Sequence, residues 1–424
     1  MTRPWEWLTL AEVLIKQPNK KVVQQGWSPK CYDHPAPEGT WGVLKTTAIQ
    51  PGRFEPEHNK ELPSTLEPKP AIEVQAGDLL LTCAGPRSRC GIPALVRATP
   101  SRLMMSGKMY RFRPDERLDP RFLELWLLSP VAQKLIDQMK TGISDSGLNL
   151  THGRFTVLPV PVPELDEQRR IVAILEDHLS CLDAATASVR ASVLRLDVLR
   201  RLVVKELAVG DMVPLKQLAV DAGYGTSVKC DVGGAGPAVV RIPNLRAGRI
   251  DLSDEKRAVD PTVDLSGAML RPGDVLIVRT NGSKDLIGRS GVVQDDVTAA
   301  FASYLIRYRV DTERLRPRWL QVMLESPTLR VKIEQLAASS AGQHNLSLSK
   351  LDGLLIPTPS LEEQDAGLAR LAAFDDQADT LHDVLEEAIQ RGESLRRALL
   401  AAAFSGRLSG APNDMSETQE MIGA

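Results

Sequence analysis

Two short stretches decide the architecture of this chain: Pro161–Gln168 reads PVPELDEQ, and Pro357–Gln364 reads PTPSLEEQ. They lie 196 residues apart, and the same offset relates several other pairs, namely Gly77 and Gly273, Asn149 and Asn345, Leu199 and Leu395, and Gly210 and Gly406. Chance similarity would not keep one register over so many positions. We therefore interpret the chain as a tandem duplication of a repeat of about 200 residues, which is too long for a solenoid and should contain a domain of its own.

The first part of each repeat, residues 1–157 and 211–356, mixes short strand-like runs with turns. The clearest strands are Asp78–Thr82 and Asp274–Val278, and each follows a Gly-Asp turn. Short helices are expected just before two Ser-Pro pairs, at Arg121–Leu128 and Arg318–Leu324. We predict two similar α+β globules.

The second part of each repeat, residues 158–210 and 357–410, is predicted to be one long helix. Pro163 and Pro359 precede each helix, acidic residues fill its first turn, and apolar residues then recur at steps of three and four. Each stripe could pack on its own globule. Because the stripes are far longer than an average helix, we favour an antiparallel intramolecular coiled coil with pseudo-twofold symmetry. The polar tail, residues 411–424, is expected to fray.

The motifs of common enzymes are absent from the sequence. It contains no G-x-x-x-x-G-K-[ST] phosphate loop and no G-x-S-x-G nucleophile elbow, and its six histidines form no H-x-x-x-H pair. We therefore expect neither catalysis nor a metal site. The five cysteines are scattered, which suits reduced thiols in a cytoplasm, and neither a signal peptide nor a membrane span is visible.

The charge of the 424-residue chain nearly cancels, with 52 basic and 54 acidic residues, but it is unevenly distributed. Residues 1–157 carry a net charge of +5 and residues 211–356 carry +2, whereas 158–210 carry −1 and 357–424 carry −8. This is a weak signal for nucleic acid. It indicates that the globules, rather than the helices, would face phosphate groups.

Two polar segments in each globule are candidates for contacts with DNA. One follows the Gly-Asp strand, and the other is a Ser/Gly-rich loop before the proline motif. Arg, Lys, Ser and Asn donate to phosphates and to guanine, and Asn can pair with adenine. The alternatives are a solvated hairpin and ordinary turn or capping chemistry. The candidate residues are Arg87, Ser88, Arg89, Lys108, Ser144, Asn149, Arg279, Asn281, Lys284, Arg289, Gln343, His344 and Asn345.

A family resemblance rests on the proline motif, which occurs twice, and on the ending Ala403–Leu408, AFSGRL, of the second helix. Over nearly its whole length the chain resembles the specificity (S) subunit of type I restriction–modification systems. The resemblance implies that the globules are target recognition domains, each reading one half of a bipartite sequence in double-stranded DNA. It implies that the chain is not an enzyme. One departure is that the first helix ends Val204–Gly210 without the phenylalanine found at position 404.

The resemblance also implies partners and their cofactors. The helices would space the globules and dock two methyltransferase (M) subunits carrying S-adenosylmethionine, and restriction (R) subunits would add ATP and Mg²⁺, so that this chain binds no cofactor itself. The candidate spacer and docking residues are Glu167, Gln168, Leu175, Leu182, Val189, Leu196, Glu363, Gln364, Leu371, Phe374, Leu381, Leu385, Leu395 and Phe404.

Two other functions compete with this interpretation. One is a coiled-coil scaffold that binds protein instead of DNA. The other is the recognition part of a divergent nuclease or of a fused restriction-methyltransferase, which the missing methylation motifs and the chain length disfavour. A DNA affinity that falls as the salt concentration rises would distinguish a recognition subunit from the protein-binding scaffold, because phosphate contacts release counterions.

Overall fold

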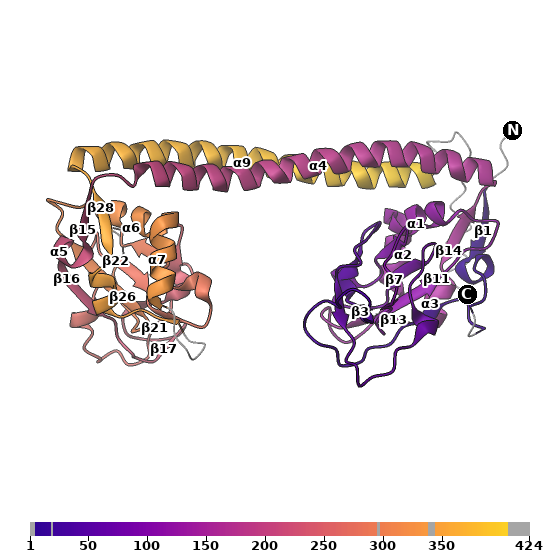
Figure 1. The fold of residues 1–424 in the computed structure, drawn as a ribbon, viewed down its shortest axis with the longest axis horizontal. Helices are drawn as coiled ribbons and strands as arrows, with labels where there is room; N and C mark the ends of the chain where they lie inside the picture. Colours follow the sequence, from indigo (N-terminus) through magenta and orange to yellow (C-terminus); the bar gives the residue numbers. More distant parts are fainter. Residues whose placement is uncertain (1–4, 18–19, 295–296, 338–343, 406–424) are drawn as a thin grey trace. The chain divides into compact units, whose positions relative to one another are not determined.

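A computed structural model describes residues 5–17, 20–294, 297–337 and 344–405 (Figure 1). The chain separates into two compact units: unit 1 ends at Ser188 and resumes at Glu387, and unit 2 runs from Val189 to Glu386. Each unit contains one α+β globule and a segment of each long helix. We call the globules globule 1, from Trp5 to Val162, and globule 2, from Asp211 to Thr358. The predicted tail lies outside the described residues.

The two long helices are α4 (Leu165–Leu207) and α9 (Leu361–Phe404). Each begins two residues after the last proline of its motif, as expected, and carries two acidic residues in its first turn. In α9, the Glu363 carboxylate accepts hydrogen bonds from the backbone nitrogen and hydroxyl of Ser360, which forms a capping box. Although both helices are long, none of the helices within the described ranges is apolar over enough residues to cross a membrane.

The two helices run antiparallel within each unit. In unit 1, Arg396 of α9 forms an ion pair with Asp183 of α4. In unit 2, Arg200 Nε of α4 lies 2.9 Å from Asp375 Oδ1 of α9, and Arg370 Nη2 lies 2.7 Å from Glu206 Oε2. Early residues of one helix therefore meet late residues of the other, which confirms the predicted antiparallel pair.

The predicted apolar seam is only partly buried. Leu175, Leu371 and Phe404 are buried, and Leu182, Val189, Leu196, Phe374 and Leu385 are half-buried. Leu381 and Leu395, however, are 45% and 50% exposed. An ideal α-helix drifts by about 20° per heptad against a strict seven-residue repeat, so a straight helix turns some seam positions away from its neighbour.

The core of each globule is a sheet that contains the Gly-Asp strand; the sheet is antiparallel in globule 1 and mixed in globule 2, where Arg249 pairs in parallel with Val292. Gly77 and Gly273 adopt positive φ angles of 89° and 83°, which a turn at this point requires. The sheet of globule 1 has the order β2 (Gln24–Gln25), β11 (Met109–Phe112), β7 (Leu79–Thr82), β9 (Pro93–Leu95). The sheet of globule 2 has the order β16 (Ala219–Tyr224), β26 (Leu305–Val310), β22 (Val275–Val278), β24 (Ser290–Val292), β20 (Arg249–Ile250), β19 (Leu245–Arg246).

The aspartate of the Gly-Asp turn is buried in both globules and is held by an arginine of the neighbouring strand. Asp78 accepts a hydrogen bond from Arg113 Nε at 2.7 Å, and Asp274 accepts one from Arg309 Nε at 2.8 Å. Each carboxylate also accepts from a backbone nitrogen three residues earlier. Buried carboxylates need such partners, so the Gly-Asp motif is part of the sheet as well as a turn signal.

Smaller sheets complete the globules. In globule 1 they are β1 (Glu6–Thr9) with β14 (Pro159–Val162), β10 (Leu103–Met104) with β3 (Gly42–Leu44) and β6 (Asn59–Glu61), β12 (Lys140–Thr141) with β13 (Leu148–Leu150) and β8 (Ala84–Gly85), and β4 (Ile49–Gln50) with β5 (Arg53–Phe54). In globule 2 they are β15 (Asp211–Pro214) with β28 (Leu355–Thr358), β17 (Cys230–Asp231) with β21 (Arg257–Ala258), β18 (Ala238–Val240) and β25 (Ala299–Phe301), and β23 (Thr280–Asn281) with β27 (His344–Asn345).

The predicted short helices are present as α1 (Pro120–Leu128) and α6 (Pro317–Glu325). The Ser-Pro pair after each ends that helix and also begins another, α2 (Pro130–Met139) or α7 (Pro327–Ala337), which the sequence reasoning missed. Proline suits a first helical position, and the Ser129 hydroxyl accepts a capping hydrogen bond from Ala132 N. Within the described ranges, the remaining α-helices are short: α3 (His152–Thr156), α5 (Leu215–Leu218) and α8 (Leu348–Asp352).

The glutamine of the proline motif joins each long helix to its globule. The Gln168 side chain is fully buried; its oxygen accepts from Asp119 N at 2.8 Å, and its nitrogen donates to Arg117 O and Pro163 O. Gln364 makes the same three bonds in unit 2, with Arg316 N, Arg314 O and Pro359 O as partners. The motif therefore fastens the start of the helix to the loop before α1 or α6.

The end of α9 packs against globule 1 through Phe404. Its ring lies edge-on to Phe122 and Trp126 of α1, with centroids 5.3 and 5.2 Å away. At the end of α4, Leu207 is also buried, and both Leu207 and Trp319 lie against Gly367. The 196-residue offset places Ala208 opposite Phe404, so the neighbouring Leu207 supplies the apolar contact at the end of α4.

Replacing Gln168 with alanine should destabilise unit 1 by about 2–4 kcal/mol, because it leaves buried backbone groups unpaired. Five of the six tryptophans lie before Ser188, so urea unfolding followed by tryptophan fluorescence reports mainly on unit 1. The control Glu167→Ala should change stability by no more than about 0.5 kcal/mol, because Glu167 pairs only within its helix. Equal losses in both variants would contradict the glutamine contact.

Truncating Phe404 to alanine should cost unit 1 about 3–5 kcal/mol, the usual range for a buried aromatic side chain. Phe404→Leu, which copies the residue found at the end of α4, should cost much less because it keeps most of the buried volume. The same fluorescence measurement ranks the two variants. If they are equally stable, the packing of α9 on α1 does not hold unit 1 together.

Candidate nucleic-acid interface

The structure brings together the two polar segments that the sequence singled out in each globule. In globule 1, Asn149 of β13 pairs with Ala84 of β8, and in globule 2, Asn345 of β27 pairs with Thr280 of β23. The segments are far apart in sequence yet form one small antiparallel ribbon in each globule. We call these ribbons strip 1 (β8 and β13) and strip 2 (β23 and β27).

A third segment, containing Lys108 in globule 1 and Tyr304 in globule 2, borders each strip. Cys83 N donates to Lys108 O at 2.8 Å, and Arg279 N donates to Tyr304 O at 3.0 Å. The backbone oxygens of Cys83 and Arg279 in turn accept from the residue after each asparagine, both at 2.8 Å. The two globules therefore build the same backbone frame.

In strip 2, Arg279 organises the neighbouring side chains. Its guanidinium lies 4.5 Å from the centre of the Tyr224 ring, and it donates to Asn345 Oδ1 at 3.3 Å. The Thr280 hydroxyl donates to the same oxygen at 3.2 Å. Because two donors hold the amide oxygen of the exposed Asn345 side chain, its NH₂ group is the part that can donate to a further group. The sequence reasoning missed Tyr224, which carries no motif and reaches Arg279 only through the fold.

In strip 1 the corresponding positions hold different residues. Cys83 stands where globule 2 has Arg279, and the Gln25 amide donates to Cys83 Sγ at 3.8 Å and to Gly107 O at 2.6 Å. Asn149 is exposed, like Asn345. The same backbone frame therefore carries different side chains in the two globules, with a buried Cys83 in place of Arg279.

Several other candidate residues use their side chains within the globules. Arg87 pairs with Asp137 at 2.7 Å and with Asp145 at 3.1 Å, and Lys284 pairs with Glu334 at 3.1 Å. Arg89 donates to the backbone oxygens of Thr46 and Ile49. Asn281 Oδ1 accepts from Ser283 N, and the hydroxyls of Ser144 and Ser146 lie 3.0 Å apart. Ser88, Lys108 and Arg289 are exposed, His344 is half-buried, and Gln343 lies outside the described residues.

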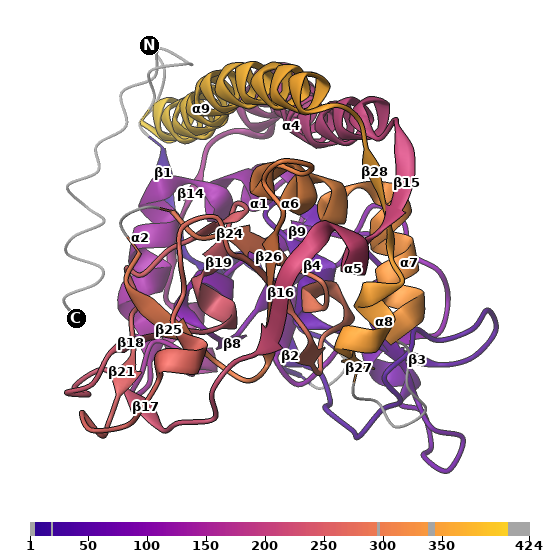
Figure 2. The same cartoon turned by 90° about the vertical axis from the view of Figure 1, so that its left-hand side faces the viewer.

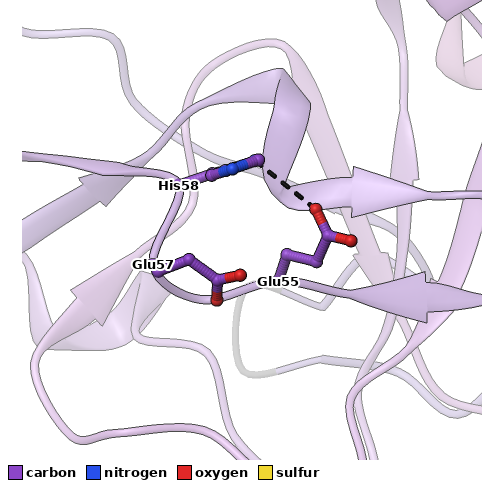
Figure 3. A group of neighbouring side chains, drawn as sticks. All are labelled: Glu55, Glu57 and His58. Carbon is purple, nitrogen blue, oxygen red and sulfur yellow. Dashed lines mark ion pairs between the residues drawn. The ribbon is translucent and has the colours of Figure 1, made fainter. Parts of the chain in front are cut away.

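One loop of globule 1 gathers Glu55, Glu57 and His58, whose ligand-type atoms lie within 4.8 Å of one another (Figure 3). The side chains have partners within the protein: Arg53 lies 2.9 Å from Glu55, and His58 Nδ1 lies 2.9 Å from Thr47 O. Exposed acidic groups commonly gather in this way without a metal ion. The cluster therefore supports no functional assignment.

The geometry defines a class of protein: a duplicated α+β protein in which each globule carries a polar strip and is fastened to a pair of antiparallel helices. Residues 54–192 match the family model described as "Type I restriction modification DNA specificity domain". The chain is therefore similar to type I restriction–modification specificity subunits.

Individual relatives agree with this placement. The chain is 34% identical to the Type I restriction enzyme EcoEI specificity subunit of Escherichia coli over 42% of its own length and 30% of that protein. It is 23% identical to the StySPI specificity subunit of Salmonella potsdam over 87% of its length and 82% of that protein. A solved structure of a study on complex assembly and conformational transition of the type I R-M system has a TM-score of 0.68 at 20% identity, covering 96% of this chain and 99% of that one. It therefore shares the fold.

Proposed function

We propose that this chain is the DNA-recognition subunit of a type I restriction–modification complex, in which each globule reads one half of a bipartite site. The observation that carries the proposal is the pair of strips, which share one backbone frame but differ in side chains at corresponding positions. Pseudo-symmetric protein suits two half-sites of DNA. Unlike side chains on the two frames suit two different half-site sequences.

Strip 2 offers chemistry for reading bases or holding phosphates. The NH₂ group of Asn345 can donate to an acceptor on a base edge or to a phosphate oxygen. In strip 1, the Asn149 amide has no such neighbouring arginine, because Cys83 occupies that position. The amide of Asn345 in strip 2 therefore has an orientation fixed by its neighbours, whereas that of Asn149 in strip 1 lacks the arginine that would fix it.

The long helices are proposed to space the globules and to dock two M subunits. On α4 of unit 2, Leu194, Val198 and Leu202 recur every four residues and are 67%, 53% and 48% exposed. On α9, Val384 is 56% exposed. Large apolar groups gathered on an exposed helix face indicate a protein interface. The partners would carry S-adenosylmethionine, and R subunits would use ATP and Mg²⁺, so this chain would supply recognition and no catalysis.

Exchanging residues 1–157 for the first globule of another family member should change only one half of the recognised sequence. Methylome sequencing of cells that carry the exchanged subunit and its M subunit measures both halves at once. The unchanged half serves as the internal control, because globule 2 is untouched. If both halves change, the globules do not read independently.

Replacing Val198 with glutamate should weaken copurification of M subunits with the chain, because it places a charge in the middle of the exposed apolar ridge formed by Leu194, Val198 and Leu202. The control Gln377→Glu adds the same charge at an exposed polar position of α9 in the same unit. Both variants should keep the wild-type unfolding midpoint, because both positions are exposed. Retention of M subunits by Val198→Glu at the wild-type level would exclude the ridge as their docking site.

A further inference from the structure

Globule 2 contains a cavity of about 330 Å³ that none of the candidate residues lines. Its wall combines two cations, Arg241 and Lys256, with the polar side chains of Thr226, Ser227 and Tyr304. None of the described residues that line it carries a carboxylate. The wall is therefore rich in hydrogen-bond donors and includes two basic side chains.

The fold presents the two cations side by side. Arg241 follows β18 and Lys256 precedes β21, and Val239 N of β18 donates to Lys256 O at 2.9 Å. The Arg241 guanidinium is positioned by Asp254: its Nη2 donates to the Asp254 backbone oxygen at 2.7 Å and forms an ion pair with the Asp254 carboxylate at 3.1 Å. Among the described residues, Arg241 Nε is buried without a hydrogen-bond partner, and Lys256 forms no ion pair. Arg241 therefore keeps one donor for a ligand, and Lys256 keeps its charge.

The remaining polar groups of the wall are neutral donors near pH 7. Burial raises the pKa of the Tyr304 hydroxyl and of the Cys230 thiol. Arg241 opposes this rise in both groups, which places its charge close to each of them. A protonated phenol and a protonated thiol beside two cations suit a ligand that only accepts hydrogen bonds.

The cavity adjoins strip 2. Arg279 N donates to Tyr304 O at 3.0 Å, and Arg279 Nη1 donates to Ser303 O at 3.3 Å, while both Ser303 and Tyr304 line the cavity. Figure 2 shows β17, β18 and β21 on the side of globule 2 opposite α7 and α8. A ligand that lies along strip 2 and passes Tyr304 would reach the cavity.

We propose that this cavity binds one backbone phosphate of the DNA that lies on strip 2. The inference rests on the proposed function. It adds a group of residues that would position the DNA backbone and would not read bases. A phosphate only accepts hydrogen bonds and carries negative charge, which matches a wall of donors and cations. Base edges present donors as well as acceptors, so a wall without a carboxylate suits them less.

Globule 1 differs at the corresponding place. Gly26 and Gly225 each pack against the corresponding backbone turn of their own globule. The residues that follow them, Trp27 and Thr226, therefore occupy corresponding positions. Lys60, which corresponds to Lys256, pairs with Asp33 at 2.6 Å. A large ring and a neutralised lysine thus replace the hydroxyl and the unpaired cation. The proposed phosphate site belongs to globule 2 alone.

The test measures DNA binding by the chain assembled with its M subunits, using a duplex that contains the site found by methylome sequencing and a random-sequence duplex. Lys256→Gln should make the slope of log affinity against log salt concentration shallower by about 0.9, the value for one phosphate contact. This corresponds to a DNA affinity that is about eightfold lower at 0.1 M salt. The loss should be equal for both duplexes. The control Lys216→Gln, an exposed lysine on α5 beside β15, should change neither slope nor affinity.

A second measurement uses the wild-type complex and needs no variant. Iodoacetamide labelling of Cys230, followed by mass spectrometry, should slow when the duplex is present. A wild-type salt slope in Lys256→Gln, a loss confined to the cognate duplex, or labelling of Cys230 at an unchanged rate would each overturn the phosphate site. If the wild-type complex bound neither duplex, the proposed function itself would fail.

Discussion

The buried glutamine of the proline motif is the contact on which the rest of the architecture depends. Gln168 and Gln364 each satisfy one backbone N–H and two backbone carbonyls, at the point where a long helix leaves its globule. Leaving such groups unpaired in a buried position is costly. The start of each long helix therefore has a set direction relative to its globule, and the apolar contacts of Phe404 or Leu207 add to an orientation already determined.

Duplication explains how one chain can carry two related but unequal binding surfaces. Backbone hydrogen bonds repeat between the globules, from the Gly-Asp carboxylates to the frame of the strips. Side chains on that frame differ: Cys83 is buried in the core of globule 1, whereas Arg279 of globule 2 lies over the Tyr224 ring and donates to Asn345.

Much of the architecture could be predicted because its signals are local. Prolines mark the helix starts, Gly-Asp turns open the central strands, and the 196-residue offset shows the duplication. Predictions failed where two physical rules compete. A Ser-Pro pair both ends one helix and starts another, and the heptad at Leu381 and Leu395 drifts out of the seam. In the candidate site, the asparagines were predictable by type and loop position, whereas Tyr224, Arg241 and Lys256 carry no motif.

The sequence by itself determined the duplication, the long helices, the α+β class of the globules and the family resemblance, because repeats, prolines and apolar periodicity act over a few neighbouring residues. Only the tertiary structure decided which polar groups share a surface. Asn345 reaches Arg279 across 66 positions, and Lys256 reaches Arg241 only after β18 and β21 join one sheet. Such contacts depend on strand pairing and burial over the whole globule, and no local pattern of residues records them.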